Sequence, residues 1–223
     1  MTFSRATQWA GCNQILGDSW SVAHAASLNC AAAGTLEFWV YVFTNDLTAI
    51  PVFVCKGNVN TAYLAFLSAG DNFTGRVVIG TVLKDAVDPV PIPRNTWTHY
   101  AMRWNSSVVQ VVKNGAQVAT TAAVGAIDTN ANPLRFGDTE VAKTNSYAGL
   151  IYDARLWNAY RDDATILANK GVALVGNEAN LVANWFIESE TGIGVTVQDR
   201  TSNNFDLTAK QSHQWSSNAG LPY

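Results

Sequence analysis

The sequence predicts an all-β protein, a sandwich of antiparallel strands, and three observations lead to this. Turn-forming residues recur at short intervals, and the runs between them are rich in Val, Ile, Phe, Tyr, Trp and Thr, which is typical of many short strands. The chain has 223 residues, of which 48% are hydrophobic and 14% charged, so it can bury a large core. Since no linker, repeat or low-complexity segment is visible, we expect residues 1–223 to form a single domain.

The clearest strand is predicted over residues 35–43, where the side chains alternate between two faces. Because both faces are largely apolar, this strand is expected to be central, with one face toward the second sheet. The two faces carry Leu36, Phe38, Val40 and Val42 on one side and Glu37, Trp39, Tyr41 and Phe43 on the other.

Further strands follow at short spacing. The Asn114-Gly115 pair is the sharpest hairpin signal, because a type I′ turn needs positive φ at both central residues. It predicts that 111–113 pairs with 117–120. Other strands are expected over 51–56, 61–67, 75–83, 96–105, 108–113, 147–157, 181–187 and 194–199.

One short helix is predicted over 161–170, as a connection over the edge of the sandwich. Acidic residues lie in its first turn, Lys170 lies at its end and Gly171 follows. This order suits the helix dipole and a glycine C-cap. The predicted architecture is therefore all-β with one short edge helix.

Composition excludes several classes of partner. The formal net charge is −3, and no basic patch indicates nucleic-acid binding. No basic amphipathic or long apolar segment indicates insertion into a membrane. The N-terminus lacks the apolar core of a signal peptide, so we expect a protein made in the cytoplasm and associated with a virion, or an extracellular protein whose leader is absent.

The cysteines Cys12, Cys30 and Cys55 form an odd and sparse set without the spacing of a zinc site. This favours three small buried hydrophobic residues over a disulfide framework. A Cys12–Cys30 bridge stays open as the alternative.

Several motifs follow one another in a fixed order. They are 95–101 (NTWTHYA), 112–115 (VKNG), 149–158 (GLIYDARLWN), 181–187 (LVANWFI) and 199–204 (DRTSNN). This ordered set resembles the concanavalin A-like lectin/glucanase superfamily, particularly its laminin G-like and pentraxin-like branches. The third motif has one residue more between glycine and aspartate than the family pattern. The resemblance implies two packed, curved antiparallel sheets, a jelly roll.

Catalysis is not expected. Glucanases of this superfamily carry an E-x-D-x-E run, which places three carboxylates on one strand face, and the chain has no such run. Glu188 and Glu190 come nearest but lack the third carboxylate. His99 lies in the middle of a predicted strand and is interpreted as a structural histidine.

Calcium is the usual cofactor of the superfamily, so the resemblance implies oxygen ligands on loops. One structural calcium ion is the expectation, although Asp153 could instead pair with Arg155, with Arg103 or with backbone N–H groups at a strand end. The candidate ligands are Asp18 and Asp153 at acidic positions of the family pattern, Asp138 and Glu140 after Phe136-Gly137, and Asn58 and Asn60 from the opposing loop.

Glycan-binding sites on such folds use aromatic faces with polar groups on loops. Most of the eight tryptophans lie in predicted strands and are assigned to the core, Trp97 among them. Trp9, Trp20 and Trp215 lie near the termini and are expected to be exposed, as sugar platforms or subunit contacts. The loop with Asp71 and Asn72 is a second candidate contact.

Three functional hypotheses follow. The first is a non-catalytic binding or adhesion module that recognises a glycan or another component of a cell or virion surface. The alternative is a structural virion protein, such as a capsid decoration, tail or fibre subunit, which acts through protein–protein contacts and would form a homo-oligomer. A glycan-cleaving enzyme that uses Glu188 or Glu190 is the third.

Overall fold

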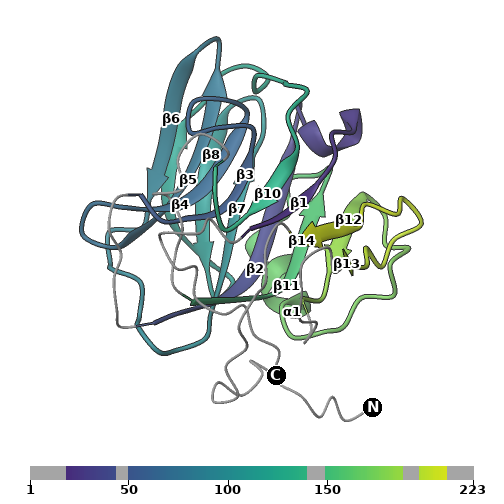
Figure 1. Cartoon of the computed structure of the whole chain (residues 1–223). Coiled ribbons are helices and arrows are strands. Elements are labelled where there is room, and N and C mark those ends of the chain that lie inside the picture. Colours follow the sequence, from purple (N-terminus) through teal and green to yellow (C-terminus); the bar gives the residue numbers. More distant parts are fainter. Residues whose placement is uncertain (1–18, 44–49, 140–148, 188–195, 210–223) are drawn as a thin grey trace.

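The computed structural model describes residues 19–43, 50–139, 149–187 and 196–209, which form two packed antiparallel sheets (Figure 1). Within these residues the strands fall into an eight-stranded and a six-stranded sheet. The predicted all-β jelly-roll sandwich is confirmed.

The eight-stranded sheet runs, in spatial order, β13 (Thr196–Val197), β14 (Leu207–Ala209), β1 (Trp20–Val22), β10 (Leu134–Phe136), β3 (Val52–Lys56), β4 (Tyr63–Ser68), β5 (Asn72–Ile79) and β6 (Val82–Val87). The six-stranded sheet runs β12 (Leu181–Trp185), β11 (Gly149–Trp157), β2 (Gly34–Val42), β7 (Thr98–Trp104), β8 (Val108–Lys113) and β9 (Ala116–Ala122). A 3-10 turn, η1 (Ala26–Asn29), and one helix, α1 (Asp163–Asn169), complete the described elements.

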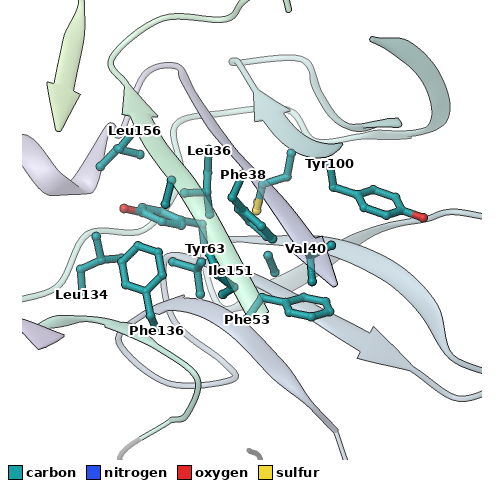
Figure 2. Packing of buried hydrophobic residues seen from close by; sticks show 14 of the residues in the cluster. Leu36, Phe38, Val40, Phe53, Tyr63, Tyr100, Leu134, Phe136, Ile151 and Leu156 are labelled. Atoms are coloured by element: carbon teal, nitrogen blue, oxygen red, sulfur yellow. The ribbon is translucent and has the colours of Figure 1, made fainter. Parts of the chain in front are cut away.

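The main core lies between the two sheets. The strand β2 has β11 on one side and β7 on the other, which confirms its predicted central position. The face that carries Leu36, Phe38, Val40 and Val42 is fully buried. Figure 2 shows this face and its neighbours, with Leu36, Phe38, Val40, Ile151 and Leu156 from the six-stranded sheet meeting Phe53, Tyr63, Leu134 and Phe136 from the eight-stranded sheet.

The single strand predicted over 75–83 is wrong, because the chain reverses there to form the β5–β6 hairpin. Gly80 and Thr81 form the turn, with φ values of 54° and 71°. The carboxylate of Asp128 accepts hydrogen bonds from both turn amides, at 2.7 and 3.0 Å. A threonine rarely adopts positive φ, so Gly-Thr does not signal this turn in the sequence.

The hairpin predicted at Asn114-Gly115 is confirmed. Asn114 and Gly115 have φ values of 53° and 88°, and β8 pairs with β9 across them. A Cβ on Gly115 would lie 2.6 Å from Cβ of Leu167 on α1. Glycine is therefore required twice here, by the turn and by the close approach of the helix.

The helix α1 lies over a sheet face, not over the predicted sandwich edge. Ile166 of α1 packs on Ala101 and Val112, which belong to β7 and β8. Asp162 caps the helix by accepting a hydrogen bond from the Thr165 amide at 2.7 Å. The predicted glycine cap is wrong, since the C-cap is Lys170 with a helical φ of −57°. Gly171 is not among the positive-φ glycines of the described residues.

Candidate functional site

The outer face of the six-stranded sheet is covered by residues 158–180, which we call the strap. Trp39 donates from Nε1 to the Lys170 carbonyl at 2.8 Å. Arg155 donates from Nη1 to the Asn169 carbonyl at 3.0 Å. Because these donors are buried and stand on strands, they hold the strap against the sheet and satisfy its backbone.

Glu37 lies beneath the strap and is fully buried. Its Oε1 accepts a hydrogen bond from Trp157 Nε1 at 2.7 Å and lies 3.9 Å from Arg155 Nη1 and from Arg161 Nε. Burial raises the pKa of Glu37, and the two guanidinium groups oppose that rise. A carboxylate enclosed in this way cannot reach a polysaccharide, so it offers no glycosidase chemistry.

His99 is buried, as expected of a structural histidine. Its Nε2 lies 3.5 Å from Glu37 Oε2, and its ring makes a T-shaped contact with that of Trp39, with 5.3 Å between centroids. Burial and the positive charges of Arg155 and Lys170 lower the pKa of His99 well below its ordinary value. The imidazole is therefore neutral at pH 7.

Asp153 is a candidate calcium ligand. In the structure it pairs with Arg155, and this pairing was the predicted alternative to calcium binding. Arg155 donates to both carboxylate oxygens, through Nε at 2.9 Å and through a short bond from Nη2. Asn184 donates to Oδ1 of Asp153 at 2.8 Å. With both oxygens accepting hydrogen bonds from fixed donors, this carboxylate is engaged in a buried ion pair.

Two of the other candidate calcium ligands, Asn58 and Asp138, lie at opposite ends of β3. Asn58 follows the end of β3, whereas Asp138 lies beside its start, next to Gly137 whose amide donates to the Phe53 carbonyl. About six residues separate these two places, or roughly 20 Å along a strand. The structure therefore does not bring Asn58 and Asp138 together.

Asn58 instead organises its own loop, where its Oδ1 accepts a hydrogen bond from the Asn60 amide at 2.8 Å. In the described part of the chain, no three His, Cys, Asp or Glu residues lie close enough to hold a metal ion. Asp18 and Glu140 lie outside the described residues.

Three partly exposed aromatic rings lie together where β2 ends and β7 begins. We call Tyr41, Phe43 and Trp97 the aromatic patch. The ring of Tyr41 lies 5.6 Å from that of Phe43 and 5.6 Å from that of Trp97, in edge contacts. Aromatic faces of this kind can stack on the apolar faces of sugar rings.

Three buried aromatic side chains support the patch from behind. Trp39, Tyr152 and Phe186 form one cluster, and Trp97 packs against it. The ring centroids of Trp97 and Tyr152 are 6.5 Å apart. The patch therefore stands on a packed layer and not on loose loop residues.

The loop 88–97 positions Trp97 and is pinned to the sheet along its length. It contains Pro89, Pro91 and Pro93, which restrict the backbone. The Ile92 amide donates to the Asp71 carbonyl at 2.9 Å, and the Asn95 amide donates to the Val42 carbonyl at 2.8 Å. Such a preorganised loop loses little entropy when a ligand binds.

Asp71 and Asn72, the predicted loop contacts, lie beside the patch. Arg94 donates from Nη2 to Asp71 Oδ2 at 2.5 Å and from Nη1 to the Phe43 carbonyl at 3.0 Å. Asn72 donates from Nδ2 to the Asp88 carbonyl at 2.6 Å, so its amide group supports the start of loop 88–97.

Trp20 is fully buried, so its expected exposure is wrong. The strand β1 is enclosed between β10 and β14, and Trp20 stands opposite Phe136 and Ala209. Trp97 departs from its prediction in the opposite sense. It was assigned to the core, but it is partly exposed and belongs to the patch. Trp9 and Trp215, the two other candidate platforms, lie outside the described residues.

The thiols of Cys30 and Cys55 are free and buried, as the hydrophobic interpretation expects, and burial raises the pKa of each to about 12. A free Cys30 contradicts the alternative Cys12–Cys30 bridge. Cys12, Glu188 and Glu190 lie outside the described residues.

Sequence reasoning missed Arg94 and the patch as a unit. The available signal was the Pro-x-Pro-x-Pro run over 89–93 directly before Arg94 and Trp97, which marks a stiff loop. Its meeting with the end of β2 depends on contacts distant in sequence, and a single sequence does not show them.

No helix in the described residues is long and apolar enough to cross a membrane. The fold is shared with several solved structures. One is a Bacteroides ovatus protein provisionally assigned to carbohydrate binding, with a TM-score of 0.74, 14% identity and 96% of this chain covered. This chain spans 60% of the length of that structure.

Two further structures share the fold at lower similarity. The heptameric SAP-like pentraxin of Limulus polyphemus gives a TM-score of 0.57 at 12% identity, with 92% of this chain and 94% of that chain covered. Domain 4 of the extracellular arabinanase AbnA from Geobacillus stearothermophilus, in complex with arabinotriose, gives 0.52 at 18% identity, with 66% and 71% covered.

No curated protein matches the sequence. A family model of the concanavalin A-like lectin/glucanases superfamily matches residues 16–167, which is more than half of the chain. This chain therefore belongs to the concanavalin A-like lectin/glucanases superfamily.

Proposed function

We propose that this protein is a non-catalytic module that binds glycans over the aromatic patch. The observation that carries the proposal is the patch itself, in which the partly exposed ring of Tyr41 makes edge contacts with those of Phe43 and Trp97. The patch lies beside a proline-rich loop that hydrogen bonds hold in place. Rings fixed in this way present apolar faces to a sugar without a large loss of side-chain entropy.

The fold and the buried carboxylates support this proposal. Two structures with the same fold are described by what they bind, one as a carbohydrate-binding protein by provisional assignment and one in complex with arabinotriose. Glu37 and Asp153 stand on the outer face of the six-stranded sheet, but both are buried and paired with Arg155. The alternative role as a virion subunit has no comparable observation in its favour.

A glycan array with the purified protein, run once with calcium and once with EDTA, tests the proposal. Trp97→Ala is expected to weaken binding about 5- to 150-fold, since one stacked ring contributes about 1–3 kcal/mol in comparable aromatic contacts. A loss of binding in EDTA would support the predicted calcium ion, and light scattering on the same samples would show whether the protein forms a homo-oligomer.

The matched control is Tyr160→Ala, which also removes a partly exposed ring from the outer side of the six-stranded sheet. Tyr160 contacts Arg103 near the opposite end of that sheet. We expect this variant to bind as the parent does. Equal losses in both variants, or no glycan bound by the parent in either buffer, would contradict the proposal.

A further inference from the structure

We propose that the aromatic patch selects neutral glycans and discriminates against acidic ones, and that the ion pair of Asp71 and Arg94 sets this preference. The inference rests on the proposed glycan-binding function and adds the chemical class of the ligand. It concerns the polar rim of the patch, whereas the proposed function concerns its rings.

The ion pair is built into the rim and is only partly exposed. The Asp71 side chain is 44% exposed and the Arg94 side chain 25%. Arg94 is held from two directions, by Asp71 Oδ2 and by the carbonyl of Phe43 in the patch. Asp71 is held as well, since its carbonyl accepts the amide hydrogen bond from Ile92. The guanidinium and the carboxylate therefore keep fixed places beside the rings.

The pair offers a hydrogen-bond acceptor and several donors at one place. Among the described residues, Oδ1 of Asp71 accepts no hydrogen bond, so it can accept one from a sugar hydroxyl. Arg94 has five N–H donors, and the two recorded hydrogen bonds leave others for sugar oxygens. Adjacent hydroxyl groups of a neutral sugar both donate and accept, and they match this arrangement.

An acidic sugar fits the same rim poorly. The charge of Arg94 is already matched by Asp71, so the guanidinium gains little from a second carboxylate or a sulfate. Asp71 would repel that second anion, which acts against acidic ligands. Two other cations lie over rings of the buried cluster behind the patch, Lys170 over Trp39 and Arg200 over Phe186. They would attract an acidic ligand, so the proposed preference requires that the repulsion from Asp71 outweighs them.

Affinity electrophoresis tests the preference with neutral arabinan, galactan, xylan and β-glucan against polygalacturonate, alginate and hyaluronan. We expect at least one neutral polymer to bind about tenfold or more tightly than every acidic one, with little dependence on salt. Asp71→Asn removes the repulsion and leaves the charge of Arg94 unmatched. Binding of acidic polymers should then rise about three- to tenfold and should weaken again as salt is added.

The matched control is Asp85→Asn, which makes the same change of charge in another ion pair. Asp85 is 33% exposed and pairs with Arg76 at 2.6 Å, across β5 and β6 of the eight-stranded sheet. We expect it to leave the preference unchanged, with folding of both variants checked by circular dichroism. An equal rise in both variants, or a parent protein that prefers an acidic polymer, would overturn the inference.

Trp97→Ala separates this inference from the proposed function. If the parent prefers acidic polymers and Trp97→Ala abolishes that binding, the patch stands as the site and only the neutral preference fails. If no polymer binds the parent, or if Trp97→Ala binds normally, the proposed site fails and the inference fails with it.

Discussion

His99 is buried between Glu37 and the ring of Trp39, in a space that excludes water. Its Nδ1 has no hydrogen-bond partner among the described residues, so a proton on that nitrogen would be costly. Burial lowers its pKa well below 6.5, and Arg155 and Lys170 add to the effect. Below about pH 6.5 the unfolded state therefore binds more protons at this residue than the folded state.

We expect this difference in proton binding at His99 to lower the stability of the folded protein in acid. As the pH falls from 7 to 5, the free energy of unfolding should decrease by up to about 1.4 kcal/mol per pH unit from His99. Protonation of Glu37, whose pKa is raised, acts in the opposite direction. Urea denaturation at several pH values should show a shallower decrease for His99→Gln. Parallel curves for parent and variant would contradict a neutral, buried His99.

Trp20 and Trp97 show where single residues escape prediction. Position near a terminus favoured exposure for Trp20, but pairing of β1 with β10 and β14 buries it. Position within a predicted strand favoured the core for Trp97, yet it precedes β7 and is partly exposed. In both cases the deciding neighbours come from distant parts of the chain, so local patterns could not identify the aromatic site.

Strands with strong local patterns were predictable, and those fixed by tertiary contacts were not. The alternation of β2 and the Asn114-Gly115 turn are local signals, and both predictions are confirmed. The strands β1, β10 and β14 have three residues each, too few to show a period. The β5–β6 turn depends on Asp128, which lies far away in the sequence.

Substitution of Thr81 in the β5–β6 turn is expected to stabilise the protein. Its φ of 71° is unfavourable for a β-branched residue, at a cost of about 1–2 kcal/mol. Thr81→Gly is expected to raise the free energy of unfolding by about 0.5–1 kcal/mol, since glycine adopts this conformation without strain. Thr120→Gly, at an exposed threonine of β9 without positive φ, should lower it by about 1 kcal/mol. Urea denaturation of both variants measures this, and a loss of stability in Thr81→Gly would contradict a strained turn.

The strand β11 shows a departure from the family pattern that the structure accommodates. The motif over 149–158 has one residue more than the pattern between Gly149 and Asp153. The register between β11 and β2 shifts by one residue between Tyr152 and Arg155, and Asp153 has a φ of 48°. A bulge of this kind takes up one extra residue and redirects side chains, and here Asp153 meets Arg155 and Asn184.

The ordered motifs predicted the sandwich as a whole, because they record the succession of strands. They did not predict that the strap crosses the outer face of the six-stranded sheet. That arrangement depends on Arg155, which joins Glu37 and Asp153 on the sheet to the carbonyls of Asn169 and Val172 in the strap. One side chain thus links two strands to a segment that follows them in the sequence.

Arg155→Met tests how far this linkage stabilises the molecule. The variant leaves Asp153 and Glu37 buried without their shared guanidinium, and removal of one member of a buried pair costs about 3–5 kcal/mol. Urea denaturation should show a loss of that size, and hydrogen exchange should show faster opening of the strap amides. Arg76→Met breaks a partly exposed pair with Asp85 and should cost no more than about 1 kcal/mol.

The double variant Asp153→Asn/Arg155→Met isolates the contribution of charge. It removes one of the two carboxylates that Arg155 serves, so it should recover part of the stability lost in Arg155→Met. No recovery would mean that the hydrogen bonds from Arg155 to the strap, and not its charge, dominate the loss. A loss in Arg155→Met no larger than in Arg76→Met would contradict the role of Arg155 as the link between sheet and strap.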